Sequence, residues 1–310
     1  MSAFRLLVLV LMLARAVATV FAQDDNPSSD HVTLTPNGSS ASLDIYSGRP
    51  VSDAVGALAK RYGYVITYED PQYVYSDDVT DATAYVRKDH RASGAGAPQL
   101  MLPRGGELSM QIPTSLCIPP SQMASTLQQL VDLPASRGGH FRMEQTKSGA
   151  MFHVIPTEVR DRNGTWSAQA LPLDARISFP ALPRTEDQLL ATIVGAVSAT
   201  AHVNMDYVID GGVVIGIPPR NPFQFNIGAD DETARDVLTR MFEARPDRKQ
   251  TWALLNAVED GPNEYELNVM DLPPSAGCQT PKPPLPPPPT QGFPCISCAP
   301  SPARPPSSGN

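Results

Sequence analysis

The stretch from Gly48 to Asp70 changes its hydrophobic period partway along. Apolar side chains first recur three and four positions apart, at Val51, Ala54, Val55, Leu58, Ala59 and Tyr62. This spacing puts them on one face of a helix, which Pro50 can begin and Gly63 can end. The residues after Gly63, YVITYED, are rich in β-branched and aromatic types and predict a strand. ASLDIYS before the helix alternates in the manner of a strand, so the stretch predicts a β-α-β unit.

The same order of elements recurs in residues 175–210. ARISF predicts a strand, and Thr185 with Gln188 predicts a capping box at the start of a helix. The apolar face of that helix consists of Leu189, Leu190, Ile193, Val194 and Val197. MDYVI then predicts a second strand, again at the end of a β-α-β unit.

Each unit is followed by a strand, a helix and a hairpin. After the first come GELSMQIP, SQMASTLQQLVDL and a hairpin around Ser148-Gly149. After the second come FQFNIGAD, a helix capped by Asp230 or Asp231, and a hairpin around Gly261-Pro262. We therefore expect an α+β fold with two tandem β-α-β-β-α-β-β modules, in which two helices pack on a small mixed sheet in each module.

The composition of the remaining segments completes a map of the chain. The predicted parts are a signal peptide (1–22), a flexible N-terminal segment (23–41), a first module (42–157) with a long surface loop (70–103), a linker (158–174), a second module (175–272) and a disordered Pro-rich tail (273–310). Asn163-Gly164 predicts a turn in the linker. The tail contains PPLPPPP, and proline can neither pair into a sheet nor continue a helix.

The N-terminus has the pattern of a secretory signal peptide. Arg5 precedes an apolar run from Leu6 to Leu13, and small residues lead to a cleavage site that we place after Ala22, with Ala18 as second choice. The run is too short to cross about 30 Å of hydrocarbon. We expect an exported protein, periplasmic or extracellular, with no transmembrane segment after signal cleavage.

The net charge and the cysteines narrow the range of functions. The formal charge is −8 without a basic stripe, which disfavours nucleic acid as a partner. Of the four cysteines, Cys295 and Cys298 form a CISC pair between prolines, away from any histidine, which disfavours a metal or redox site. A disulfide among Cys278, Cys295 and Cys298 is expected in this exported chain, with Cys117 a free thiol or the fourth partner.

No spacing of residues predicts catalytic, cofactor-binding or metal-binding chemistry. The five histidines have no metal-ligand spacing, and neither a nucleophile elbow nor a phosphate loop is present in the sequence. We therefore expect no cofactor and no enzymatic activity. Tyr73, Tyr75 and Tyr85 in the long loop are a candidate contact surface, unless they fasten the loop to its own domain.

The stretch SLDIYSGRPVSDAVGALAKRYGYVITYED resembles the secretin and TonB short N-terminal (STN) domain. ETARDVLTRMFEARPDRKQTWALL in the second half is similar in outline. The sequence departs from that family in its 70–103 insertion and in carrying neither a secretin pore domain nor a TonB-dependent barrel. The resemblance implies a bacterial envelope setting and a role in protein contact.

Two functional hypotheses follow. In the first, the chain is a non-enzymatic envelope protein that docks to another envelope protein through sheet edges or exposed helix faces of its modules. In the second, it binds a small molecule or glycan in the cleft between the modules. Free strand edges would favour the first hypothesis, and a polar, aromatic-lined cleft would favour the second.

Overall fold

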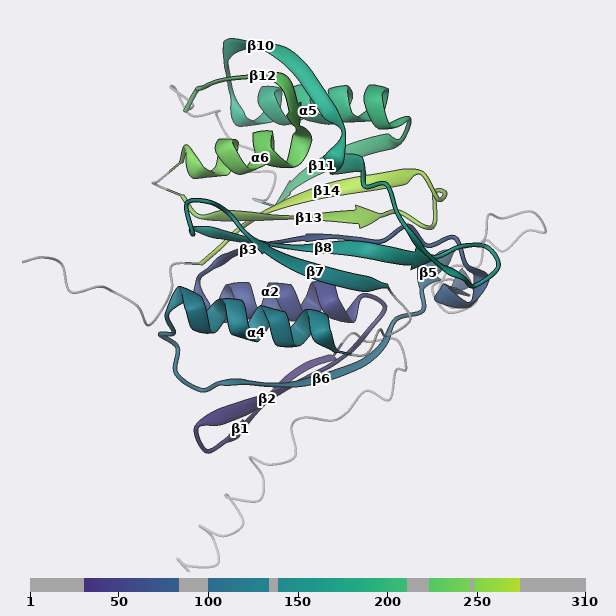
Figure 1. The fold of residues 1–310 in the computed structure, drawn as a ribbon, viewed down its shortest axis with the longest axis vertical. Helices are drawn as coiled ribbons and strands as arrows, with labels where there is room; N and C mark the ends of the chain where they lie inside the picture. Colours follow the sequence, from purple (N-terminus) through teal and green to yellow (C-terminus); the bar gives the residue numbers. More distant parts are fainter. Residues whose placement is uncertain (1–30, 84–99, 134–138, 211–222, 246–247, 274–310) are drawn as a thin grey trace, which may run out of the picture. The chain divides into compact units, whose positions relative to one another are not determined.

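The computed structural model describes residues 31–83, 100–133, 139–210, 223–245 and 248–273. The fold is α+β (Figure 1). Its helices are α2 (Pro50–Tyr62), α4 (Pro120–Asp132), α5 (Glu186–Ala201) and α6 (Ala234–Glu243). In the described part of the chain no helix has the length and apolar character needed to cross a membrane.

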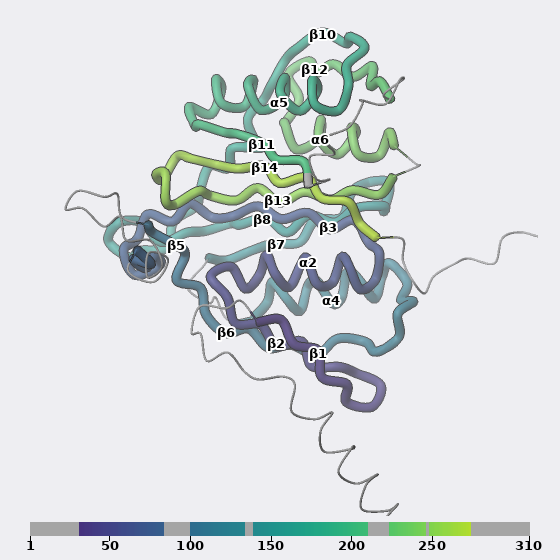
Figure 2. The backbone as a smooth tube through the Cα atoms, turned by 180° about the vertical axis from the view of Figure 1, so that it is seen from behind, coloured from purple at the N-terminus to yellow at the C-terminus, as the bar shows by residue number. Residues whose placement is uncertain are grey.

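The first half of the chain contributes strands to two layers. β2 (Ser40–Ser47) pairs antiparallel with β1 (His31–Asn37) and with β6 (Gly106–Pro113). In the other layer, β3 (Val65–Glu69) runs parallel to β8 (Met151–Arg160). β7 (His140–Gln145) forms an antiparallel hairpin with β8. Helices α2 and α4 lie between the two layers, and Figure 2 shows β2 and β6 on their far side.

Corresponding pairings occur in the second half. β10 (Arg176–Arg184) pairs antiparallel with β12 (Phe225–Thr233). β11 (Asn204–Asp210) runs parallel to β14 (Glu264–Asp271). β13 (Gln250–Asn256) forms an antiparallel hairpin with β14. The pairing of β10 with β12 thus corresponds to the pairing of β2 with β6. In the same way, the set β11, β14 and β13 corresponds to the set β3, β8 and β7 of the first half.

A single central sheet runs through both halves. β13 pairs in parallel with β3, which gives the order β11-β14-β13-β3-β8-β7. β9 (Trp166–Ala168) pairs with the end of β8 as the seventh strand. Although we expected a separate small sheet in each half, strands from the two halves join edge to edge. The strand directions show that the second set is inverted relative to the first.

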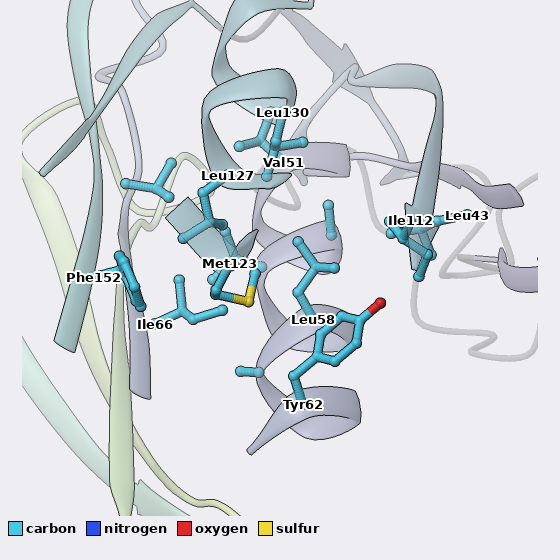
Figure 3. Packing of buried hydrophobic residues seen from close by; sticks show 14 of the residues in the cluster. Leu43, Val51, Leu58, Tyr62, Ile66, Ile112, Met123, Leu127, Leu130 and Phe152 are labelled. Carbon is cyan, nitrogen blue, oxygen red and sulfur yellow. The ribbon is translucent and has the colours of Figure 1, made fainter. Parts of the chain in front are cut away.

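The inversion puts the two helix pairs on opposite faces of the central sheet (Figure 1). Side chains of β13 alternate accordingly: Ala253 enters the core beneath α2 and α4, while Trp252 and Leu254 enter the core beneath α5 and α6. Because successive residues of a strand face opposite sides, both faces of β13 are buried. Figure 3 shows the core beneath α2 and α4, with Leu58, Met123 and Leu127 at its centre.

Local signals determine where the helices begin and end. Gly63 adopts a left-handed conformation (φ 68°) after α2, as expected for a C-terminal cap. The capping box of Thr185 and Gln188 is confirmed at the start of α5. The expected cap of the last helix is wrong: Thr233, rather than Asp230 or Asp231, accepts a hydrogen bond from the Asp236 N–H. The two aspartates instead lie in β12, which continues further than the sequence pattern indicated.

Segments expected to lack regular structure contain short strands. Residues 31–37, expected in a flexible segment, form β1, whose hairpin with β2 turns at Gly38-Ser39. The loop 70–103 contains β4 (Val79–Asp81) paired with β5 (Met101–Pro103). The linker contains the end of β8, strand β9 and a 3-10 turn, Pro172–Asp174. The expected turn at Asn163-Gly164 is confirmed by the hydrogen bond from the Gly164 N–H to the Asp161 carbonyl.

Candidate docking surface

The junction between the halves has a short main-chain ladder. Two residue pairs link β3 to β13, Tyr68 with Ala253 and Glu69 with Leu254. The N–H of Asp70 adds one more step by donating to the Leu254 carbonyl over 2.7 Å. Because each such bond contributes only about 1 kcal/mol net, side chains must supply much of the stability of the junction.

Asp70 is the centre of one buried polar network at this junction. Its side chain is fully buried and accepts hydrogen bonds from Arg49 Nε (2.7 Å), Tyr68 OH (2.7 Å), Tyr73 OH (3.2 Å) and the Asn256 N–H (3.1 Å). Arg49 also donates to the Asn256 carbonyl over 2.7 Å, so it bridges the two halves. Burial, followed by the charge of Asp70, raises the pKa of Tyr68 and of Tyr73. Both hydroxyl groups therefore stay protonated and donate to Asp70. The network stabilises the junction and holds the Asp70 carboxylate away from solvent.

Glu69 forms the second network on the opposite face of β3. Arg235 of α6 binds it with two hydrogen bonds, Nε to Oε1 at 2.5 Å and Nη2 to Oε2 at 3.0 Å. The third nitrogen of Arg235, Nη1, donates to Asp174 Oδ1 at 2.5 Å. Burial raises the pKa of Glu69, and the guanidinium opposes that shift. Such a forked pair gives a defined geometry, so α6 is held over a strand of the first half.

His153 on β8 lies beside this second network. Its Nδ1 is 2.7 Å from Thr67 Oγ1, and its Nε2 is 3.4 Å from Thr239 Oγ1. Burial, followed by the charge of Arg235, lowers the pKa of His153 from 6.5 to about 4. The imidazole is therefore neutral at pH 7. Its ring packs beside Trp252 in the interior, where no substrate can reach it, so the geometry fits a structural role.

The central sheet ends at β11, and this edge is the candidate docking surface. β11 is paired with β14 along its whole length, while no strand in the described residues pairs with its other side. The Asn204 N–H donates to Asn263, towards β14. Since main-chain groups alternate along a strand, those of Met205, Tyr207 and Ile209 point to the open side.

Side chains cover part of this open edge. The Met205 N–H donates to Ser198 Oγ at 3.2 Å, and the Tyr207 N–H donates to Asp206 Oδ1 at 2.8 Å. A carboxylate on an edge strand is one way in which proteins discourage indiscriminate pairing. Val208 is nevertheless 45% exposed on the face away from α5. The edge therefore combines an apolar side chain with main-chain groups that a partner strand could bind.

The opposite end of the sheet is β7. It pairs with β8, and no described strand pairs with its outer side. Phe141 and Met143 face the core beneath α4, whereas Arg142 and Glu144 lie on the other face and form an exposed ion pair of 2.7 Å. The β7 edge thus carries exposed charged side chains, whereas the β11 edge includes the exposed apolar side chain of Val208.

Two surface pockets lie elsewhere on the described part of the chain. One, of about 480 Å³, is lined by residues of both halves and of the linker, including Gln72, Asp174, Asn263 and Tyr265. The other, of about 370 Å³, lies between β6 and α4 and is lined mostly by serine and glutamine. Neither pocket is lined by Glu69, Arg235 or His153.

The loop tyrosines divide between burial and partial exposure. Tyr73 is buried and bonds to Asp70, so the expectation that it lines a contact surface is wrong, and it fastens the loop to the junction instead. Tyr75 is half-buried and packs against the Arg160 guanidinium, 4.7 Å from the ring centroid. Tyr85 lies outside the described residues.

The cysteine predictions fall mostly on residues outside the described ranges, namely Cys278, Cys295 and Cys298. Cys117 lies in the described part, after β6, and is disulfide-bonded, which removes the free-thiol alternative. No cluster of three or more metal-ligating side chains occurs among the residues that the structure describes.

Sequence reasoning missed both polar networks. Their members are ordinary charged residues by spacing, because Arg49 and Asn256 lie 207 positions apart and Glu69 and Arg235 lie 166 apart. A signal for the open edge was present, since MDYVI is predicted to be a strand and an acidic residue such as its Asp206 is typical of an edge. No protein-family model, curated protein or solved structure matches the chain.

Proposed function

We propose that the chain is an exported, non-enzymatic protein of the cell envelope that docks to another protein through the open edge of β11. The observation that carries this proposal is the side of β11 with which no strand of the described residues pairs, where Val208 is exposed beside outward main-chain groups. Strand addition would give a partner the main-chain hydrogen bonds of the edge, and Val208 would contribute an apolar contact.

We also propose that the halves are tandem modules of the STN-like kind. The support is the corresponding order of strand pairings in residues 40–160 and 176–271. In this interpretation the second module supplies the docking edge, because β13 of that module already occupies the corresponding edge of the first, β3.

A photo-crosslinking amino acid at position 208 of the full chain tests the docking proposal. Leu182 on β10 is the matched control position, because it is a similarly exposed aliphatic residue outside the central sheet. We expect position 208, and not position 182, to give one saturable crosslink to an envelope protein, which excess unlabelled chain abolishes. Equal crosslinks at the two positions, or none at 208, would contradict the proposal.

Export has a separate test. N-terminal sequencing of protein recovered from the envelope should begin at Gln23, after removal of residues 1–22. A chain that still begins at Met1 and stays in the cytoplasm would contradict export without bearing on the docking edge.

A second candidate function is small-molecule or glycan binding. It is favoured by the 480 Å³ pocket, which is lined by Gln72 of the first half, the linker and Tyr265 of the second half. Its amide and carboxyl groups suit a hydroxyl-rich ligand. A thermal-shift screen with sugars, compared between the natural chain and Asn263→Ala, tests this function: a ligand that stabilises only the natural chain would support it.

A further inference from the structure

We propose that the partner strand at the β11 edge is β7 of a second copy of the chain, so that copies assemble head to tail through their central sheets. This inference rests on the proposal that the β11 edge docks a strand, and it names a second copy of the chain as the protein that supplies that strand. It follows from the way in which the two halves of one chain already pair.

The occupied junction inside the chain defines the geometry. There β3, the edge strand of the first half, pairs in parallel with β13, the outer strand of the second-half hairpin. By the order of pairings, β11 corresponds to β3, and β7 corresponds to β13. The two sheet edges that no strand of the described ranges covers are therefore the same two types of edge that pair with each other at the junction.

The strand directions agree with this pairing. β7 is antiparallel to β8 and hence to β3, and β11 is parallel to β14 and hence antiparallel to β13 and β3. β11 and β7 therefore run in the same direction. A second copy displaced along the sheet without inversion brings its β7 beside β11 in parallel, which is the arrangement of β13 beside β3.

Individual residues support the correspondence of β11 with β3. Gly63 and His202 precede these strands in the left-handed conformation, with φ of 68° and 56°. Counting from them, Tyr207 takes the place of Tyr68, and both hydroxyl groups donate to an aspartate over 2.7 Å. The next residue is Glu69 in β3 and Val208 in β11.

The contrast between those two positions shows what is missing at the β11 edge. Glu69 is buried because α6 of the other half covers it and supplies Arg235. Val208 occupies the corresponding position and is 45% exposed. The helix that corresponds to α6 is α4, which precedes the β7 hairpin, so α4 of a second copy would cover Val208.

We expect the charges on β7 to weaken the association without preventing it. Arg142 and Glu144 would enter the interface as a pair that is already formed. The occupied junction buries charged pairs as well, such as Glu69 with Arg235. Desolvation of such pairs makes association weaker than an apolar interface of equal area, so we expect assembly to depend strongly on concentration. Because the two edges are different surfaces, the contact is heterologous and leaves a free edge at each end of the assembly.

Sedimentation equilibrium of the mature full chain, up to about 1 mM, tests the inference. Two variants each block one edge. Val208→Glu places a carboxylate without a cation at the position where β3 has Glu69 paired with Arg235. Arg142→Glu removes the cation that pairs with Glu144 and so places like charges beside the acidic β11 edge. Leu182→Glu is the control on β10. All three positions are exposed, so circular dichroism should show folded chains.

We expect the mean mass of the natural chain and of Leu182→Glu to rise with concentration past that of a dimer. Val208→Glu and Arg142→Glu should each remain monomeric, and their equimolar mixture should form a dimer and stop there, because each supplies one intact edge. A natural chain that stays monomeric at every concentration, or a Val208→Glu variant that assembles like the natural chain, would overturn the inference. If the natural chain stays monomeric, a saturable crosslink from position 208 to another protein would still support the docking proposal. The absence of that crosslink would contradict the docking proposal as well as this inference.

Discussion

The buried histidine of β8 makes the stability of the fold dependent on pH. Burial lowers the pKa of His153 in the folded chain to about 4, against 6.5 when the chain is unfolded. The unfolded chain therefore binds more protons as the pH falls between these values, and folding loses stability throughout that window. The loss amounts to about 2 kcal/mol between pH 7 and pH 5 and about 3 kcal/mol by pH 4, where it nears completion.

His153→Gln removes the titration while an amide can still bond to Thr67. Urea unfolding at pH 7 and pH 5 should show that the natural chain loses about 2 kcal/mol more stability than this variant. His140→Gln is the matched control, because this histidine lies on the neighbouring strand and is exposed. Identical losses for the natural chain and His153→Gln would refute the reasoning, since the charge of the imidazole would then cost nothing on burial.

Three further substitutions have defined outcomes in urea unfolding. Arg235→Met leaves Glu69 buried without its cation and should lower the free energy of unfolding by about 3–5 kcal/mol. The double variant with Glu69→Leu should regain much of that loss, and additive losses would contradict this coupling. Thr185→Ala removes the confirmed capping box and should cost about 1 kcal/mol, and an unchanged midpoint would show that the cap adds nothing. Gly105→Ala should prevent normal folding around β6, because Gly105 has a φ of +54° and an added Cβ would lie 1.9 Å from the Ser47 carbonyl oxygen; soluble protein of natural stability would contradict that geometry.

Patterns confined to a few neighbouring residues predicted much of the fold. The apolar face of α2 and its Gly63 cap follow from spacing within one helix, and so does the capping box at Thr185. Strand β1 was not predicted, although Val32 and Leu34 alternate with threonines and Gly38-Ser39 suits a two-residue hairpin turn, because the run is short and ends at Pro36. Patterns of this local kind identify elements but contain no information on which elements pair.

The junction could not be predicted for that reason. Nothing near Asp70 in the sequence indicates that its carboxylate meets Arg49 and the main chain of Asn256, which is 186 positions away. The inverted joining of the two halves likewise depends on β13 reaching β3, a contact between segments that the sequence pattern had assigned to separate sheets. The open β11 edge became recognisable as a site only once the order of the strands was known.

The junction also has a consequence for the order in which the chain can fold. During synthesis, residues up to 160 emerge first with β3 as an unpaired edge, and Glu69 and Asp70 still lack Arg235 and Asn256. Contacts of such high sequence separation slow folding, because a large loop must close before they form. We therefore expect the first half to wait in an incomplete, association-prone state until the last hairpin arrives, and a chaperone that shields the β3 edge would shorten that exposure.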